Sequence, residues 1–181
     1  ISPSQDRENY GLFMRELRKA LDDLGPGYLL TAAIPGGDNP SSRYDMAMLD
    51  EVLDYMHIMS YDLHNSSRTC HHTALYSSNN TPYGSVDSSV KSFVKAGFPK
   101  SKIVLGIAFY GKYVSVPEGT NGGLGGKTTS KYNTLTYGAI YQSFLSKLGN
   151  GVTYYWDKDS KAPYLYDANN IGSYIGYDDS Y

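Results

Sequence analysis

The sequence is poor in cysteine and tryptophan, with one of each among its 181 residues, and it has no long apolar run. A single cysteine, Cys70, excludes a disulfide within the chain and any metal site built from several cysteines. No apolar stretch approaches the roughly 20 residues that a transmembrane helix needs, so we expect no membrane partner. The first residues also lack the basic and then apolar order of a signal peptide.

An excess of charge of one sign is missing as well. The net charge is −2 and the lysines and arginines form no cluster, so we expect no nucleic-acid partner. Cys70, His71 and His72 are three potential metal ligands in a row, but adjacent residues rarely converge on one tetrahedral ion. The glycine-rich segment 117–126 lacks the spacing of a phosphate-binding loop. We therefore expect neither a metal nor a cofactor.

The chain is, in contrast, rich in apolar and aromatic side chains. Apolar residues make up 40% of it and aromatic residues 14%, with nineteen tyrosines, which is enough for one domain with a substantial core. The tyrosines either pack with their hydroxyls at the water or form an aromatic platform for a sugar. Asn65-Ser66-Ser67 and Asn79-Asn80-Thr81 fit the pattern of a glycosylation acceptor.

Helical and extended patterns alternate in the first part of the chain. Helical spacing and apolar runs predict, in order, helix 6–24, strand 28–34, helix 45–53, strand 55–62, helix 85–95 and strand 103–110. This alternation is typical of a parallel α/β sheet. The helical residues expected to face inward are Tyr10, Phe13, Met14, Leu17, Leu21, Leu24, Met46, Leu49, Leu53, Val86, Val90, Phe93 and Val94.

The pattern changes after Lys112. A glycine-rich stretch is followed by a predicted helix over 135–148 and a predicted hairpin of strands 152–156 and 163–166. The inward face of this helix is expected to carry Tyr137, Ile140, Tyr141, Phe144 and Leu148.

Tyr61 and Asp62 form the most informative pair, because they stand where an apolar strand ends. Ligands of α/β proteins gather at the carboxyl ends of the strands, and a buried carboxylate needs partners. The alternative is that Asp62 caps the next turn and Tyr61 belongs to the core. The polar segment 65–84 that follows is long for a loop, and long ordered loops are usually functional.

Met59-Ser60-Tyr61-Asp62 resembles the M-x-Y-D motif of glycoside hydrolase family 18, the chitinases and chitinase-like proteins. Four further stretches resemble segments of that family in the family's order: 30–35, 72–76, 102–111 and 175–179. The resemblance implies an α/β fold, with strands five to seven of a (β/α)₈ barrel in residues 1–113. Residues 114–170 would form a small α+β insertion domain, and residues 171–181 would return toward the barrel.

A closed barrel typically takes about 250 residues, and this chain has no match to the family's acidic D-x-x-D-x-D-x-E motif. Segment 2–10 resembles the stretch that follows this motif in the family. The resemblance therefore implies an internal piece of a larger catalytic domain, whose remainder would be a partner of this chain. The chain alone is expected to be inactive.

The resemblance also implies an extracellular chitinase, which cleaves β-1,4-linked N-acetylglucosamine polymers with retention and with the substrate's own acetamido group as nucleophile. Tyr61 and Asp62 would be its catalytic residues here. Substrate would be bound by Met59, Tyr110, Lys112 and Trp156. Lys112 stands where the family commonly has arginine, which keeps the charge but not the forked geometry. Trp156 either lines the cleft or packs within the insertion.

Two other functions fit the sequence. A chitinase-like lectin would bind chitooligosaccharides without cleaving them, and the residue that discriminates it from an enzyme lies in the acidic motif. A stand-alone α/β domain of unrelated function would require five family-like segments in order by coincidence.

Overall fold

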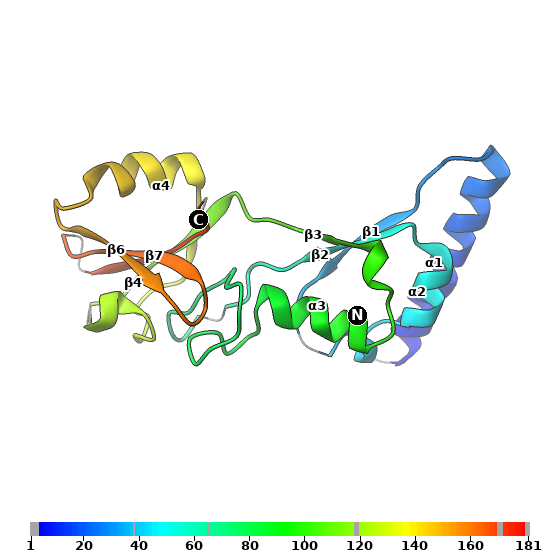
Figure 1. Ribbon diagram of the computed structural model, residues 1–181, viewed down its shortest axis with the longest axis horizontal. Helices are drawn as coiled ribbons and strands as arrows, with labels where there is room; N and C mark the ends of the chain where they lie inside the picture. The colour runs from blue at the N-terminus through cyan, green and yellow to red at the C-terminus, as the bar shows by residue number, and fades with distance from the viewer. Residues whose placement is uncertain (1–3, 38, 65, 118–119, 170–171, 180–181) are drawn as a thin grey trace. The chain divides into compact units, whose positions relative to one another are not determined.

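The computed structural model describes residues 4–37, 39–64, 66–117, 120–169 and 172–179 (Figure 1). These residues group into two compact units. The first unit comprises Ile1–Ser60 and Ser88–Gly106, and the second comprises Tyr61–Asp87 and Ile107–Tyr181. None of the described helices is both long and apolar enough to cross a membrane.

The first unit is built on a parallel sheet. Its strands are β1 (Thr31–Pro35), β2 (Tyr55–Met59) and β3 (Ile103–Leu105), which pair in the order β1-β2-β3. The connecting elements are α1 (Ser4–Leu24), η1 (Pro40–Ser42), α2 (Met46–Val52), α3 (Val86–Lys95) and η2 (Lys100–Lys102), with the first two residues of α3 assigned to the second unit. Helices between parallel strands make this unit an α/β arrangement, as the sequence predicts.

Local sequence explains the ends of these helices. The Asp45 carboxylate accepts a hydrogen bond from the Met48 backbone N–H at 3.2 Å and so caps the first turn of α2. Gly25 follows α1 with a φ of 132°, a conformation that glycine adopts without a steric cost.

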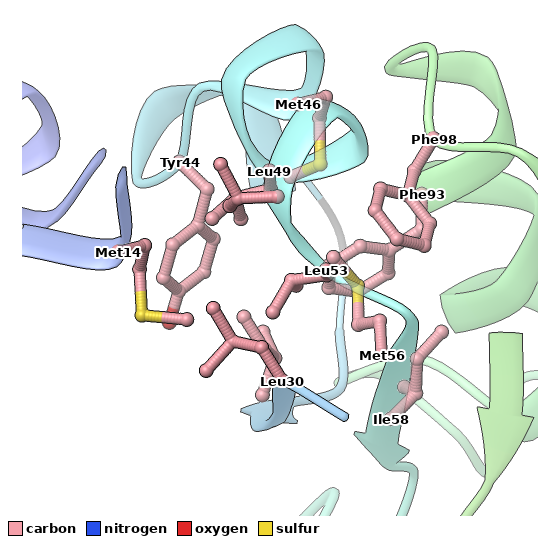
Figure 2. Close-up of a cluster of buried hydrophobic side chains, with 12 residues drawn as sticks. Met14, Leu30, Tyr44, Met46, Leu49, Leu53, Met56, Ile58, Phe93 and Phe98 are labelled. Atoms are coloured by element: carbon pink, nitrogen blue, oxygen red, sulfur yellow. The ribbon is translucent and has the colours of Figure 1, made fainter. Parts of the chain in front are cut away.

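The core of the first unit lies where α1, α2 and α3 meet the sheet. Figure 2 shows the side chains that converge there, from helices and strands far apart in the sequence. Its most deeply buried members are Ile34, Leu49, Leu53, Met56, Ile58, Phe93 and Phe98. Met56 and Ile58 point to this core from alternate positions of β2, so Tyr55, His57 and Met59 point to the other face.

Nine of the thirteen predicted inward residues of these helices are confirmed, Val86 is half-buried, and three are not confirmed. Met14, Met46, Leu49, Leu53 and Phe93 are buried, and Tyr10, Leu17, Leu21 and Val90 pack against them. Phe13, Leu24 and Val94 are 57%, 72% and 41% exposed. Leu24 is the last residue of α1, and Phe13 and Val94 directly neighbour the buried Met14 and Phe93 in the sequence.

The second unit contains an antiparallel sheet with the order β5-β4-β8-β7-β6. Its strands are β4 (Tyr110–Ser115), β5 (Asn133–Thr136), β6 (Val152–Asp157), β7 (Ala162–Asp167) and β8 (Ser173–Gly176). The short helices are η3 (Thr120–Gly123), α4 (Tyr137–Ser143) and η4 (Leu145–Lys147). The predicted hairpin is confirmed as β6 and β7.

Each face of this sheet has its own core. Ile140 of α4 and Phe144, the residue that follows α4, cover one face, together with Val152, Leu165 and Ile175 of the strands. Val114, Val116, Leu124, Tyr164 and Tyr174 form the core of the other face. Gly111 of β4 allows close packing, since a Cβ there would lie 2.6 Å from both the Gly176 carbonyl oxygen and Ile140 Cδ1.

The predicted helix 135–148 is shorter in the structure, and only part of its inward face is buried. Leu135 belongs to β5, and α4 begins at Tyr137 after the Thr136 side chain caps it. Tyr137, Tyr141 and Leu148 are 40%, 59% and 46% exposed, and Leu148 lies beyond α4, which ends at Ser143.

In the structure, the predicted strand 103–110 is divided between two strands, β3 and β4. β3 ends at Leu105, and β4 starts at Tyr110 in a different sheet. β8 pairs between β4 and β7, so residues 173–176 belong to the second unit. The division into 1–113, 114–170 and 171–181, which the resemblance implies, remains a prediction beside these two compact units.

The polar loop, residues 66–84, also belongs to the second unit. It contains no helix or strand in the structure, but backbone hydrogen bonds join it to other segments of this unit. The Tyr76 N–H donates to the Ser160 carbonyl at 3.1 Å, and the Thr69 N–H donates to the Gly126 carbonyl at 3.0 Å. The Thr69 hydroxyl also donates to the Gly123 carbonyl. The loop is therefore ordered by contacts with distant segments.

Candidate functional site

The candidate site is centred on the carboxylate of Asp62. The chain leaves β2 at Met59, and Asp62 has a φ of 61°, in the left-handed region that aspartate tolerates better than most residues. Two backbone hydrogen bonds support this turn. The His64 N–H donates to the Asp62 carbonyl at 2.8 Å, and the Leu63 N–H donates to the His72 carbonyl at 3.1 Å.

Two side chains from β4 bind one oxygen of this carboxylate. The Tyr110 hydroxyl donates to Asp62 Oδ1 at 2.8 Å, and Lys112 Nζ lies 2.9 Å from the same atom. Lys112 Nζ also donates to Thr134 Oγ1 at 3.1 Å and lies 5.2 Å from the centre of the Tyr110 ring. The Asp62 side chain is nevertheless 50% exposed, and no described residue donates to its Oδ2. One oxygen is thus held by the protein while the other remains open to a ligand.

Aromatic rings surround this carboxylate. The Tyr61 ring meets the Tyr110 ring edge to face, with 5.9 Å between centres and 78° between planes. The His72 ring stacks on the Tyr110 ring, with 5.5 Å between centres and 28° between planes. An aromatic wall beside a hydrogen-bonded carboxylate suits a polyhydroxylated ring, which offers apolar faces and polar edges.

Asp62 is ionised at neutral pH. Burial acts to raise the pKa of the Asp62 carboxyl, but the hydrogen bonds from Lys112 and Tyr110 outweigh it and leave the pKa below its usual value. Burial raises the pKa of the Tyr110 hydroxyl, and the Asp62 carboxylate raises it further, so Tyr110 remains a donor. Asp62 can therefore accept a hydrogen bond from a ligand hydroxyl or amide.

His72 is the neutral neighbour of this ionised group. Its side chain is 1% exposed, and burial lowers the pKa of its imidazole to about 3 against the opposing effect of Asp62. His72 Nδ1 lies 4.0 Å from Asp62 Oδ1, which is too long for a hydrogen bond. Neither ring nitrogen has a hydrogen-bond partner among the described residues.

A second polar network joins the polar loop to the β6–β7 hairpin. His71 Nε2 lies 3.0 Å from Asp157 Oδ2, and the Asn80 amide donates to the same oxygen at 2.9 Å. Asp157 Oδ1 accepts the backbone N–H groups of Asp159 and Ser160 at 3.0 and 3.3 Å. Burial opposes ionisation, but these donors lower the pKa of Asp157 to about 2. The network fixes the segment that also carries His72.

A third carboxyl group, Asp178, lies beside the same segment. The Thr73 hydroxyl donates to Asp178 Oδ1 at 2.6 Å. Burial raises the pKa of Asp178 to about 6, with a further contribution from Asp179, although the Thr73 hydrogen bond acts against it. Asp178 is therefore the carboxyl of this region that is easiest to protonate near neutral pH.

The structure brings together four of the six predicted site residues: Tyr61, Asp62, Tyr110 and Lys112. Met59 belongs to the first unit, where it pairs with Pro35 at the end of β2. Trp156 lies on the face of the antiparallel sheet that carries Leu165, Ile175 and Tyr113, whereas Lys112 lies on the opposite face. Trp156 is 39% exposed there. The alternative in which Asp62 only caps a turn does not account for its bonds to β4.

In the sequence, His72 is a potential metal ligand and part of the family-like stretch 72–76, and neither feature relates it to Asp62. Within the described ranges, no three His, Cys, Asp or Glu side chains group closely enough to hold a metal ion, and Cys70 is a buried free thiol. The feature of the sequence that could have indicated a contact with Asp62 is the position of His72 in the polar loop that follows Tyr61 and Asp62. The partners of Asp157 and Asp178 could not be predicted locally, because they are 77 to 105 residues away in the chain.

Comparison with known proteins shows the family and the fold of this chain. The model of glycosyl hydrolases family 18 matches residues 1–181. A probable chitinase 2 of Drosophila melanogaster is 33% identical over 92% of this chain and 36% of its own length. A family 18 N-acetylglucosaminidase from Paenibacillus barengoltzii is 33% identical, with a TM-score of 0.85 over 99% of this chain and 54% of that structure.

A class V chitinase from Nicotiana tobaccum, solved in complex with NAG4, is 25% identical, with a TM-score of 0.82 over 98% of this chain and 53% of that structure. The chain thus spans about half of these structures and about a third of the Drosophila relative. The likeness confirms the expected fold class, part of a (β/α)₈ barrel with a small α+β region. With its whole length matched by the family model, the chain belongs to glycosyl hydrolases family 18.

Proposed function

We propose that this chain contributes the substrate-positioning part of a chitinase site, in a protein that cleaves β-1,4-linked N-acetylglucosamine polymers. The observation that carries the proposal is the half-occupied carboxylate of Asp62. Tyr110 and Lys112 hold Oδ1 and keep the group ionised, and Oδ2 faces no donor within the described residues. Such a carboxylate accepts a hydroxyl or amide N–H of a sugar.

The chemistry of the family gives these residues distinct roles. A retaining, substrate-assisted glycosidase uses the acetamido oxygen of the sugar as nucleophile and a separate glutamic acid as proton donor. In this proposal the Tyr61 hydroxyl donates to the acetamido carbonyl and orients it for attack. Asp62 accepts from the sugar and favours the positive charge that develops on the acetamido group.

Lys112 has a positioning role. Its ammonium fixes Asp62 Oδ1 as a point charge, and it cannot offer the paired N–H groups of an arginine. Met59 and Trp156 remain proposed substrate contacts, as apolar floor and cleft wall respectively. The proton donor would come from a D-x-x-D-x-D-x-E segment outside this sequence, in the remainder of the barrel.

The experiment compares wild type with Tyr61→Phe and Asp62→Asn in the intact protein. A chromogenic chitobioside reports cleavage, and titration calorimetry with chitotetraose reports binding. We expect wild type to release chromophore and each variant to lose about 10²-fold or more in kcat, a typical size for one such catalytic interaction. Wild type that neither cleaves nor binds contradicts the proposal.

The lectin alternative has its own signature in this experiment. The intact protein would bind chitotetraose in calorimetry and release no chromophore, and Asp62→Asn would weaken binding alone. We also propose that the intact protein is extracellular, as the resemblance to chitinases implies. Detection of the protein in the culture medium of its source tests this.

A further inference from the structure

His72 is a buried side chain of the Asp62 region, and the described residues give neither of its ring nitrogens a hydrogen-bond partner. Its imidazole is 1% exposed. An unpartnered buried nitrogen costs free energy, so it persists where another role compensates for it. Its nearest carboxylate is Asp62, with 4.0 Å between His72 Nδ1 and Asp62 Oδ1.

The backbone of His72 is tightly fixed, so the ring has little freedom to find another partner. The His72 carbonyl accepts from the Leu63 N–H at 3.1 Å. The side chains of its two neighbours are also held. His71 Nε2 lies 3.0 Å from Asp157 Oδ2, and the Thr73 hydroxyl donates to Asp178 Oδ1 at 2.6 Å. The ring itself lies against Tyr110, the residue that donates to Asp62.

The groups that act electrostatically on His72 define its protonation state. They are Asp62, which favours the imidazolium, and His64, Lys112 and His71, which oppose it. Burial opposes the imidazolium most strongly, so the ring is neutral at any pH near neutrality. Lys112 already supplies the cation that Asp62 needs, which makes a charged pair between His72 and Asp62 redundant.

We propose that His72 is a positioning residue for Asp62, whose Nδ1–H donates to Oδ1 when a sugar hydroxyl binds at Oδ2. This inference rests on the proposed function, since it concerns the same carboxylate. The Asp62 side chain is half-exposed, and a shift of about 1 Å brings Oδ1 and His72 Nδ1 within hydrogen-bond distance. No proton is transferred; the neutral imidazole remains a donor throughout.

This arrangement would give Oδ1 three donors in the bound state: the Tyr110 hydroxyl, the Lys112 ammonium and His72 Nδ1–H. Three donors on one oxygen fix the direction of the other, so the sugar meets a carboxylate already aimed at it. In the ligand-free protein the third donor is held close but not engaged. The competing explanation is that His72 is only a core ring that packs against Tyr110.

The test uses His72→Phe, His72→Asn and His72→Gln in the intact protein. Phenylalanine keeps the ring against Tyr110 and removes both nitrogens. Asparagine places an amide N–H near the position of Nδ1, whereas the longer glutamine places it near Nε2. The readouts are kcat and KM for a chromogenic chitobioside and the Kd of chitotetraose by calorimetry.

We expect His72→Phe to lose about 10-fold or more in kcat/KM, or in affinity if the protein only binds the sugar. His72→Asn should recover most of this loss and His72→Gln should not, a split that a purely packing role does not produce. In His72→Phe the acidic limb of the pH profile should move to higher pH, because Asp62 loses a donor that favours its ionised form. Tyr141→Phe, which removes the polar atom of an exposed ring on α4, is the matched control and should change none of these readouts.

Two outcomes separate this inference from the proposed function. Wild type that cleaves or binds the sugar while His72→Phe behaves identically overturns the role of His72 alone. Wild type that does neither overturns both. If His72→Phe does not fold, the wild-type protein labelled with ¹⁵N is titrated with chitotetraose. A downfield shift of the Nδ1 proton supports the inference, and an unchanged signal overturns it.

Discussion

At the scale of single residues, the structure separates two kinds of acidic side chain in the second unit. Asp62 and Asp157 are held ionised by donors, whereas burial favours the protonated form of Asp178. The difference does not follow from the type of residue, since all three are aspartates with the same ordinary pKa. It follows from the balance between burial, which raises the pKa of each carboxyl, and the donors that face it, which lower the pKa.

Lys112→Met is expected to raise the pKa of Asp62. The variant removes a hydrogen bond and a charge that favour the carboxylate, and it leaves the Tyr110 hydrogen bond in place. In the intact protein, sugar binding should weaken as the pH falls. The midpoint of this loss should lie at a higher pH in Lys112→Met than in wild type. Lys112→Arg is the control and should restore the wild-type midpoint. Identical midpoints in wild type and Lys112→Met would mean that Lys112 does not act on Asp62.

Asp178→Asn is expected to stabilise the protein at pH 7.5 and to have little effect at pH 4. The folded-state pKa of Asp178 lies at about 6, above its ordinary 3.8, so its contribution to stability is complete below pH 3.8 and is lost as the pH rises through 6. An amide resembles the protonated acid and still accepts from Thr73. Urea denaturation should show a gain of about 2 kcal/mol at pH 7.5. A loss of stability at that pH contradicts the assignment.

The residues of the site differ in how far sequence could predict them. Tyr61, Asp62, Tyr110 and Lys112 could be grouped because they stand at strand ends that a family motif marks. The contact of His72 with Asp62 could not, because it depends on how a loop without periodicity folds back on itself. The same holds for Thr73 and Asp178, which are 105 residues apart.

At the scale of elements, the polar loop matters most, because it orders without any helix or strand. Its main attachment to the β6–β7 hairpin is the network of His71, Asn80 and Asp157. Sequence indicated that such a long loop would be functional but gave no partner for it. The helices and strands themselves were predictable from periodicity, and their errors lie at the ends, as in the division of strand 103–110 at Gly106.

Asp157→Asn is expected to loosen this loop at neutral pH. The pKa of Asp157 is lowered from 3.8 to about 2, so its carboxylate contributes stability above about pH 4 that is lost as the pH falls through 2. The variant should lower the free energy of unfolding at pH 7 by about 2 kcal/mol, and the difference should shrink at pH 2.

Hydrogen exchange provides the local measurement for this variant. The amides of Tyr76 and Thr69, which donate to carbonyls outside the loop, should exchange faster in Asp157→Asn than in wild type. Amides of β2 in the first unit are the internal reference and should be unaffected. Unchanged protection of Tyr76 and Thr69 would show that the loop is fixed by other contacts.

At the scale of the whole molecule, each unit leaves large apolar side chains in contact with water. In the first unit, Leu24, Tyr28 and Leu29 are 72%, 53% and 63% exposed. In the second unit, Ile107 and Phe109 are 66% and 81% exposed. Among the described strands of the parallel sheet, β1 and β3 each have one edge without a partner. Contiguous apolar surface and free strand edges both favour association.

The 181-residue chain, expressed alone, is therefore expected to bind an apolar fluorescent dye and to self-associate. Dye fluorescence and light scattering after size-exclusion chromatography measure the two effects. Phe109→Ser should reduce dye binding without lowering stability, because the side chain buries little in this structure. A monomer that does not bind the dye and unfolds in one sharp transition would support the stand-alone domain instead.

The left-handed backbone at Asp62 restricts which amino acids evolution or an engineer can place there. Glutamate preserves the charge but is poorly suited to a φ of 61°, whereas asparagine and glycine accept that conformation and abolish the charge. Saturation mutagenesis at this codon should thus yield well-folded proteins that no longer bind the sugar, and few variants that still bind it. Aspartate alone meets both demands, so any search for altered specificity must begin at the residues around it.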